Sequence, residues 1–236
     1  MSLSQLKERS NLKVQKTFQR KDLTFSEIHS VDTPNGRFYS TPLGVFPSVT
    51  TILSSGQEKG YLTEWRERVG EEEAAKVTKE ATDRGTAVHN MIEKYLLGKE
   101  VSLVNPILRG HFLQIKKHLD SLECIYANEI PLYSKHLKVA GRCDCVAMIN
   151  NEIHIVDFKT SKHQKTFEEI ESSKMQCAAY TFMINEMFGL KVSKFSILLS
   201  NLYENKCDFY HGESKQYIKE FWELRKKWKN TISQSS

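Results

Sequence analysis

The amino-acid sequence predicts an α/β protein with a central mixed β-sheet flanked by helices. One observation is an apolar stripe of helical spacing over residues 85–97, which ends at Gly98. A second is a set of three consecutive strand-like segments bounded by turn residues: 125–132, 139–149 and 152–160. A third is the helical segment over 166–188, after which the chain has a second hairpin over about 192–210. Helices, three strands, a helix and further strands are typical of a mixed sheet covered by helices.

The N-terminal half predicts a hairpin followed by helices. Residues 1 to about 23 are polar and basic and are expected to be flexible. Asn35-Gly36 predicts a turn between two short strands. Ser48 or Thr50 is suited to cap a helix that ends near Gly56. The later helical segments include one with Tyr61, Leu62 and Trp65, one over 71–84 and, after 85–97, one over 105–122.

The composition favours one large domain. No Gly/Ser/Pro-rich linker interrupts the 236 residues, so we expect a single domain over 24–236. Within it we expect an N-terminal hairpin and helical region (24–122), a core that carries the strands (123–212) and a C-terminal helix (213–236). The formal net charge of +5 permits binding to a polyanion without demonstrating it.

The five cysteines and the hydropathy pattern indicate which metal sites, cellular compartment and membrane segments to expect. The cysteines show no paired C-x-x-C spacing, which argues against structural zinc. Their odd number and the lack of a signal peptide favour a reducing intracellular compartment, the cytoplasm; a mitochondrial transit peptide is only weakly supported. No apolar run approaches the roughly 20 residues that a membrane span requires. Cys143 and Cys145 are expected on one face of their strand, opposite Asp144.

A hairpin over residues 139–159 carries the most informative pattern. Asn150-Asn151 suits its turn, because asparagine tolerates positive φ. Counting back from that turn sets Asp144 opposite Asp157, at a Cβ separation of about 5 Å. Asp157 and Lys159 share a face, since strand side chains alternate.

Two carboxylates at the end of an apolar strip are unfavourable unless they are protonated or neutralised by a cation. A divalent metal beside Lys159 is the simplest solution. The alternative is an exposed strand end whose charges are solvated or paired as Asp157–Lys159.

The hairpin resembles the signature of the PD-(D/E)XK nucleases. Its form, G-R-C-D followed by V-D-F-K-T-S, most resembles the RecB-like exonuclease branch. R-G-T-A-V-H at residues 84–89 looks like the upstream helix motif of that branch, and Q-C-A-A-Y at 176–180 like its downstream Q-x-x-x-Y motif. P-S-V-T at 47–50 is similar to the mitochondrial genome maintenance exonucleases and their phage-encoded relatives.

This resemblance implies a restriction-endonuclease-like core with the N-terminal helices as an arch over the site. It implies Mg²⁺ as the cofactor, with Mn²⁺ accepted. Some relatives hold an iron–sulfur cluster with closely spaced cysteines, a spacing that this chain lacks, so no cluster is expected. The expected metal ligands are His89, Asp144, Asp157 and the carbonyl of Phe158. The expected catalytic residues are Asp144, Asp157, Lys159, Glu129, Gln176 and Tyr180.

Each of these residues has an expected role. Glu129 would act through a coordinated water or a second metal. Lys159 would orient the attacking water and stabilise negative charge; it could be a general base only if its pKa were strongly lowered, and the neighbouring carboxylates act in the opposite direction. Gln176 and Tyr180 share a helix face and would bind a phosphate or Lys159. The expected phosphate contacts are Arg84, Arg142, Thr160, Ser161 and Lys162.

The resemblance implies a monomeric, metal-dependent DNA exonuclease that prefers single-stranded ends and works in DNA repair, recombination or replication, with or without partner proteins. Phosphate contacts carry no sequence information, so little sequence specificity is expected. Tyr61 and Trp65 could stack on unpaired bases or lie in the core. The alternatives are a structure-specific DNA or RNA endonuclease of the same fold and a non-catalytic nucleic-acid-binding subunit.

Overall fold

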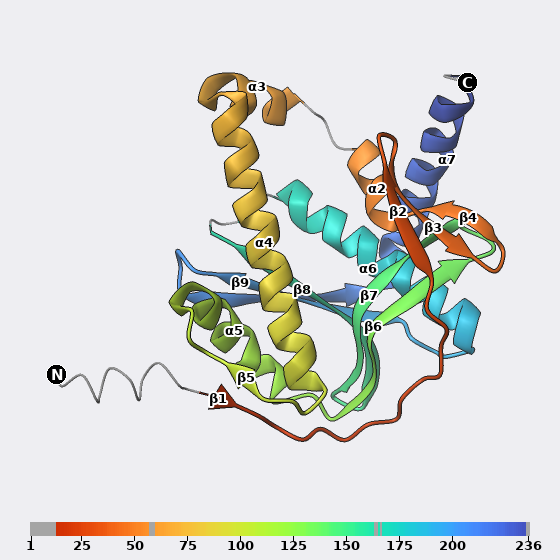
Figure 1. Ribbon diagram of the computed structural model, residues 1–236. Helices are drawn as coiled ribbons and strands as arrows, with labels where there is room; N and C mark the ends of the chain where they lie inside the picture. The colour runs from red at the N-terminus through yellow and green to blue at the C-terminus, as the bar shows by residue number, and fades with distance from the viewer. Residues whose placement is uncertain (1–12, 57–59, 163–164, 166, 235–236) are drawn as a thin grey trace.

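A five-stranded mixed sheet forms the centre of the protein (Figure 1). The computed structural model describes residues 13–56, 60–162, 165 and 167–234. The strand order is β10-β9-β8-β7-β6, in which only β8 and β9 are parallel. The strands are β6 (Cys124–Ser134), β7 (Val139–Ile149), β8 (Glu152–Ser161), β9 (Lys194–Asn201) and β10 (Lys206–Glu213). The expected mixed α/β fold is therefore confirmed.

The predicted hairpins form with the expected turns. β7 and β8 pair through Ile149 and Glu152, and Asn150 and Asn151 both have positive φ (50° and 61°), as a tight asparagine turn requires. Asn205 (φ 50°) turns β9 into β10 in the same way. The parallel pair β8–β9 needs a crossover, which α6 (Phe167–Phe188) supplies before the chain turns at Gly189.

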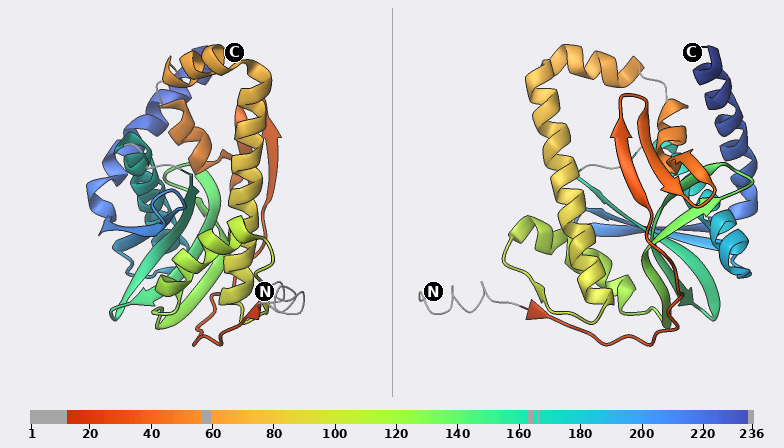
Figure 2. Two further views of the ribbon diagram at one scale, coloured as in Figure 1. Left: turned by 90° about the vertical axis from the view of Figure 1, so that its left-hand side faces the viewer. Right: turned by 45° about the vertical axis from the view of Figure 1, so that its right-hand side comes forward.

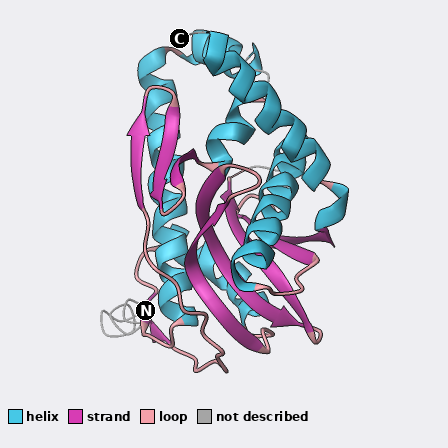
Figure 3. Ribbon diagram, turned by 90° about the vertical axis from the view of Figure 1, so that its right-hand side faces the viewer, coloured by secondary structure: helices cyan, strands magenta, loops and turns pink. Residues whose placement is uncertain are grey.

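Helices cover both faces of the sheet, as Figure 3 shows. One face packs against α4 (Glu71–Leu96) and α5 (Pro106–Leu119), with Asn105 as the N-cap of α5. The other face packs against α2 (Val49–Ser55), α6 and α7 (Ile218–Gln234). The predicted stripe of α4, namely Val88, Ile92, Tyr95 and Leu96, is fully buried.

The N-terminal region adds a small antiparallel sheet and an extended helix. The small sheet contains β2 (His29–Thr33), β3 (Gly36–Thr41) and β4 (Gly44–Pro47). The turn at Asn35-Gly36 is confirmed by a φ of 110° at Gly36, and Ser48 caps α2. The expected helical segments 71–84 and 85–97 form one helix, α4. In Figure 2 its first half extends beyond the sheet and meets α3 (Gly60–Val69) there.

Residues 13–23 differ from the expected flexible segment. β1 (Lys13–Val14) pairs with β5 (Val101–Ser102), and Arg20 bridges to Ile125 of β6. Phe18 is buried and packs edge-on against Tyr95, which anchors this stretch of chain under α4. Residues 1–12 lie outside the described part of the chain. No described helix is long and apolar enough to cross a membrane.

Candidate active site

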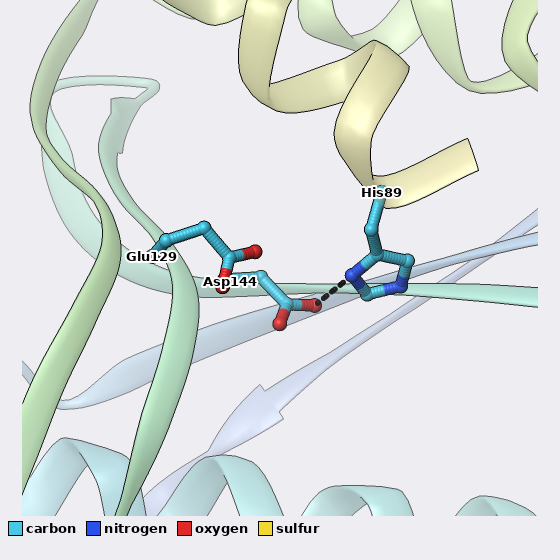
Figure 4. Close-up of side chains that lie close together, drawn as sticks. All are labelled: His89, Glu129 and Asp144. Atoms are coloured by element: carbon cyan, nitrogen blue, oxygen red, sulfur yellow. Dashed lines mark ion pairs between the residues drawn. The ribbon is translucent and has the colours of Figure 1, made fainter. Parts of the chain in front are cut away.

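Three potential metal ligands converge from three different elements. His89 of α4, Glu129 of β6 and Asp144 of β7 each offer one ligand atom, and these atoms lie within 4.8 Å of one another. Figure 4 shows the imidazole and the two carboxylates pointing toward a common space. Sequence motifs far apart in the chain are thus brought together, and Glu129 lies directly in the cluster.

Irregular backbone in two strands gives Glu129 and Asp144 their positions. Glu129 has a φ of 48°, rare for a residue other than glycine, and the β6–β7 register shifts between Ile125 and Ala127. Cys143 lies in the core under α6, whereas Cys145 lies in the core under α4 and α5. The expectation that both cysteines share one face is therefore wrong, because the regular alternation of side chains breaks around Asp144.

The hairpin register is confirmed up to the pair Cys145–Val156, one pair before Asp144 and Asp157. Beyond that point a side chain takes the place of the backbone pairing. Oδ2 of Asp144 accepts a hydrogen bond from the backbone N–H of Phe158 at 2.8 Å. This bond fixes the Asp144 carboxylate at the end of the ladder.

His89 is held by the neighbouring strand. Its Nε2 lies 2.8 Å from the carbonyl oxygen of Phe158, and its Nδ1 lies 3.7 Å from Oδ2 of Asp144. A carbonyl can only accept, so Nε2 carries the proton and, in the neutral ring, Nδ1 presents a lone pair toward Asp144 and Glu129. The Phe158 carbonyl, expected as a metal ligand, here orients the imidazole.

A second row of polar groups follows Asp157. Lys159 donates from Nζ to Oδ1 of Asp157 (2.7 Å) and to Oε1 of Gln176 (3.2 Å). Gln176 in turn donates from Nε2 to the hydroxyl of Tyr180 at 3.4 Å. Of the partners expected for this pair, Lys159 is the one that Gln176 contacts, while Tyr180 contacts Gln176. Gly141 leaves space for Tyr180, since a Cβ at this glycine would lie 2.8 Å from the tyrosine hydroxyl.

Asp157 is the buried anchor of this row. It is 2% exposed, and its Oδ2 has no hydrogen-bond partner among the described residues. Burial raises the pKa of Asp157 to about 6, against the lowering effect of Lys159 and with a further increase from Asp144. Burial alone would lower the pKa of Lys159, but the carboxylates of Asp157 and Asp144 raise it well above its usual range. Lys159 is therefore an ammonium ion.

Glu129 is in an unfavourable electrostatic position without a cation. Burial raises its pKa to about 8, and the charges of Asp144 and Glu93 add to that effect, while Arg142 opposes it. The carboxylates thus accumulate negative potential at the point where the side chains converge. This is the potential that a divalent cation neutralises.

A cavity of about 640 Å³ opens beside these groups, within the size range of ligand sites. His89, Glu129, Gln176 and Tyr180 line part of it. The remainder includes residues that the sequence motifs did not indicate: Arg37, Tyr39, Asn90 and Glu93. Glu93 lies four residues after His89 and so on the same helix face, a spacing that could have identified it. Arg37 and Tyr39 come from β3, whose place beside the site depends on tertiary packing.

The five expected phosphate contacts do not all reach this cavity. Arg142 lines it and is held by the carbonyl of Glu129 and the carboxylate of Glu27. Thr160 and Ser161 lie at the end of β8, where Gly85 of α4 faces the Thr160 hydroxyl.

Four of the five expected contacts lie outside the cavity lining: Arg84, Thr160, Ser161 and Lys162. Lys162 is exposed and pairs with Glu80 at 3.6 Å. Arg84 is half-buried, and its Nε has no partner among the described residues. Trp65 is also half-buried, while the side chain of Tyr61 lies outside the described part.

The chain is similar in sequence to curated exonucleases. A curated relative from Xenopus tropicalis, mitochondrial genome maintenance exonuclease 1, is 27% identical over 154 residues, which are 60% of this chain and 44% of that protein. The Homo sapiens protein of the same name is 26% identical over 171 residues, which are 65% of this chain and 50% of that protein. The chain thus spans about half the length of these relatives.

The family comparison covers most of the chain. The model of the PD-(D/E)XK nuclease superfamily matches residues 58–234, a range that contains α4, the whole central sheet and every residue of the His89–Glu129–Asp144 cluster and the Asp157–Lys159 pair. The chain belongs to the PD-(D/E)XK nuclease superfamily.

Proposed function

We propose that this protein is a metal-dependent exonuclease that hydrolyses phosphodiester bonds at DNA ends and prefers single strands. The observation that carries the proposal is the convergence of His89, Glu129 and Asp144 beside the Asp157–Lys159 pair. The two relatives are both exonucleases, which supports the reaction type.

The donor set fits a divalent cation. Glu129 and Asp144 offer carboxylate oxygens, and His89 offers Nδ1 while its Nε2 donates to the Phe158 carbonyl, the arrangement common for metal-binding histidines. The unpartnered Oδ2 of Asp157 would be a further oxygen donor, for the same ion or for a water bound to it. Oxygen ligands suit Mg²⁺, and one imidazole also suits Mn²⁺. Such an ion, when bound, lowers the pKa of water and stabilises charge on the phosphate.

Lys159 acts as a fixed cation. Asp157 and Gln176 hold its ammonium group, and its raised pKa keeps it protonated. It therefore orients a water or binds a phosphate oxygen and does not remove a proton. Gln176 and Tyr180 position it, and through it the reacting phosphate.

The substrate contacts support cleavage of many sequences. Arg142 lines the cavity. Thr160 and Ser161 end β8, Lys162 follows them and Arg84 lies on α4; in this proposal these four contact the neighbouring phosphates. Contacts of this kind fix a backbone and read no bases. We infer that the helices α3 and α4 form the arch through which a free strand end enters, which accounts for a preference for ends.

The test compares end-labelled linear single strands with a closed single-stranded circle, in Mg²⁺, in Mn²⁺ and in chelator. Metal-dependent loss of the linear strand alone is the expected result, and the product ladder gives the polarity. Loss of the circle as well would establish an endonuclease. Intact substrates in every metal, with the protein bound to them, would establish a binding subunit.

A further inference from the structure

A second cavity adjoins the active-site cavity and has no part in the proposed function. It measures about 780 Å³ and shares two lining residues, Arg37 and Thr50, with the active-site cavity. Its other walls come from the β2–β3 turn, from the last turn of α2 and from α7. In Figure 2 these three elements stand together, on the side of the site away from α5. The two cavities are therefore neighbours that meet at Arg37 and Thr50.

The walls of the second cavity are fixed to one another. The backbone N–H of Arg37 donates to the Thr51 hydroxyl at 2.9 Å, and that hydroxyl donates back to the Arg37 carbonyl at 3.1 Å. Gly36 packs so closely on Thr51 that a Cβ there would lie 2.4 Å from the threonine Cγ2. Gly56 makes an equally close contact with Leu224 of α7. The hairpin, α2 and α7 therefore form a pre-organised surface.

The lining of the second cavity suits a polyanion with flat, stackable groups. Thr50, Thr51, Ser54 and Ser55 line one wall, where the hydroxyls of Thr51 and Ser55 donate to backbone carbonyls and that of Ser54, unpartnered among the described residues, remains for a ligand. Lys227 and Trp228 of α7 form the opposite wall, and the guanidinium of Arg225 lies 5.1 Å from the centre of the Trp228 ring. The one acidic residue in the lining, Asp32, is already neutralised by Arg37, with its oxygens 2.8 and 3.0 Å from the guanidinium nitrogens.

We propose that this second cavity binds the single strand beyond the nucleotide that occupies the active site. The strand passes Arg37 and Thr50, its phosphates face the hydroxyls of α2 and the ammonium group of Lys227, and a base contacts the exposed part of Trp228. A positively charged groove with an aromatic side chain is the usual platform for single-stranded nucleic acid. This inference rests on the proposed function, because it extends the substrate of the same active site.

A charge at Ser54 tests the path without disturbing the core. Ser54 is exposed and lines only the second cavity. Ser54→Glu places a carboxylate on the path, and Ser54→Gln has the same size without the charge. With a strand of about 16 nucleotides we expect Ser54→Glu to raise KM about fivefold over Ser54→Gln at equal kcat. A dinucleotide, too short to extend from the active site along the second cavity, should show equal KM for both variants.

Trp228→Ala provides a second, independent measurement. Its matched control is Trp222→Ala, on the same helix but outside the lining of both cavities. Loss of one base contact should weaken binding of the long strand about fivefold, measured by fluorescence anisotropy in chelator, while the control binds as the unmodified protein does.

Two results together would overturn the proposed strand path even if the protein cleaves DNA. They are an equal KM of the two Ser54 variants for the long strand and equal binding of that strand by the two tryptophan variants. If the unmodified protein cleaves neither strand, the proposed function fails, and the anisotropy comparison alone decides whether the second cavity binds the strand.

Discussion

Nε2 of His89 donates a hydrogen bond to the carbonyl oxygen of Phe158, 2.8 Å away, and this single contact sets which nitrogen faces the two carboxylates. Phe158 lies between Asp157 and Lys159 in β8, so β8 itself orients the imidazole on α4. Its backbone N–H holds Asp144 at the same time. One peptide segment thus positions two side chains of the cluster that come from two other elements.

Replacing this imidazole should weaken metal binding more than folding. We expect His89→Ala to lower the apparent affinity for Mg²⁺ by about 10- to 100-fold and to change the ratio of Mg²⁺- to Mn²⁺-supported cleavage. Metal titrations of the cleavage rate measure both quantities. His136→Ala, at a largely exposed histidine far from the cavity, is the control. An unchanged metal profile would make His89 a structural residue.

The two aspartates of the hairpin should differ in their effect on stability. Asp144→Asn removes one of several clustered negative charges, so the metal-free protein should gain about 1–2 kcal/mol. Asp157→Asn instead leaves Lys159 without its ion pair, and because that lysine is partly exposed the loss should be about 2–3 kcal/mol. Both variants should lose cleavage at least about 100-fold.

Urea denaturation in chelator measures these two changes in the free energy of unfolding, and cleavage assays measure the loss of activity. If Asp157→Asn proved as stable as Asp144→Asn, the Asp157–Lys159 pair would not anchor the row of polar groups in the site. Near-normal cleavage by either variant would remove that aspartate from the active site.

The hairpin that carries these residues was predictable because short-range rules determine it. The turn at Asn150-Asn151 fixes the register, and the register brings Asp144 and Asp157 to the same end of the sheet. His89 is different, because its helix position alone does not separate a ligand from a structural histidine, and only the resemblance of R-G-T-A-V-H to the nuclease helix motif indicated it. Local turn chemistry therefore suffices for the hairpin but not for His89.

The rest of the site depends on interactions that no local pattern encodes. Glu129 has a left-handed backbone and the β6–β7 register shifts, so side-chain alternation alone gave the wrong face for Cys143, which packs on the side opposite Cys145, Val156 and Phe158. Arg37 reaches the cavity only because α2 binds the β2–β3 hairpin. Two-residue strands such as β1 have no period to detect, so the anchoring of residues 13–23 was missed.

Glu129 should make the metal-free protein less stable as the pH rises. Its pKa is about 8 in the folded protein, above its ordinary value of 4.5, so folding disfavours its ionised form. The folded state binds more protons than the unfolded state between these values. Stability in chelator should therefore fall by about 2–5 kcal/mol from pH 4.5 to 8, and a saturating divalent metal should abolish that fall.

Glu129→Gln is the matched variant for this pH dependence. Glutamine keeps the size of the side chain and cannot ionise. Between pH 4.5 and 8 in chelator, the stability of the variant should therefore fall by about 2–5 kcal/mol less than that of the unmodified protein. Thermal denaturation at closely spaced pH values measures both proteins. Parallel curves for the two would show that Glu129 is well solvated and outside the cluster.

Acid should destabilise the protein through a different buried group, His111 of α5. It is fully buried, Nδ1 lies 2.7 Å from the Ser200 hydroxyl, and Nε2 has no partner among the described residues. Burial lowers the pKa of His111 to about 4, with a contribution from the charge of Arg84. Between pH 6.5 and 4 the unfolded chain therefore binds a proton that the folded protein excludes, and this site should remove up to about 3 kcal/mol of stability as the pH falls.

His111→Gln is the variant that tests this pH dependence. It should lower the free energy of unfolding at neutral pH, but that free energy should then fall less steeply toward acid pH than it does in the unmodified protein. A variant with an equally steep acid limb would show that His111 titrates normally, and that the buried network with Ser200 does not exclude the charged imidazole.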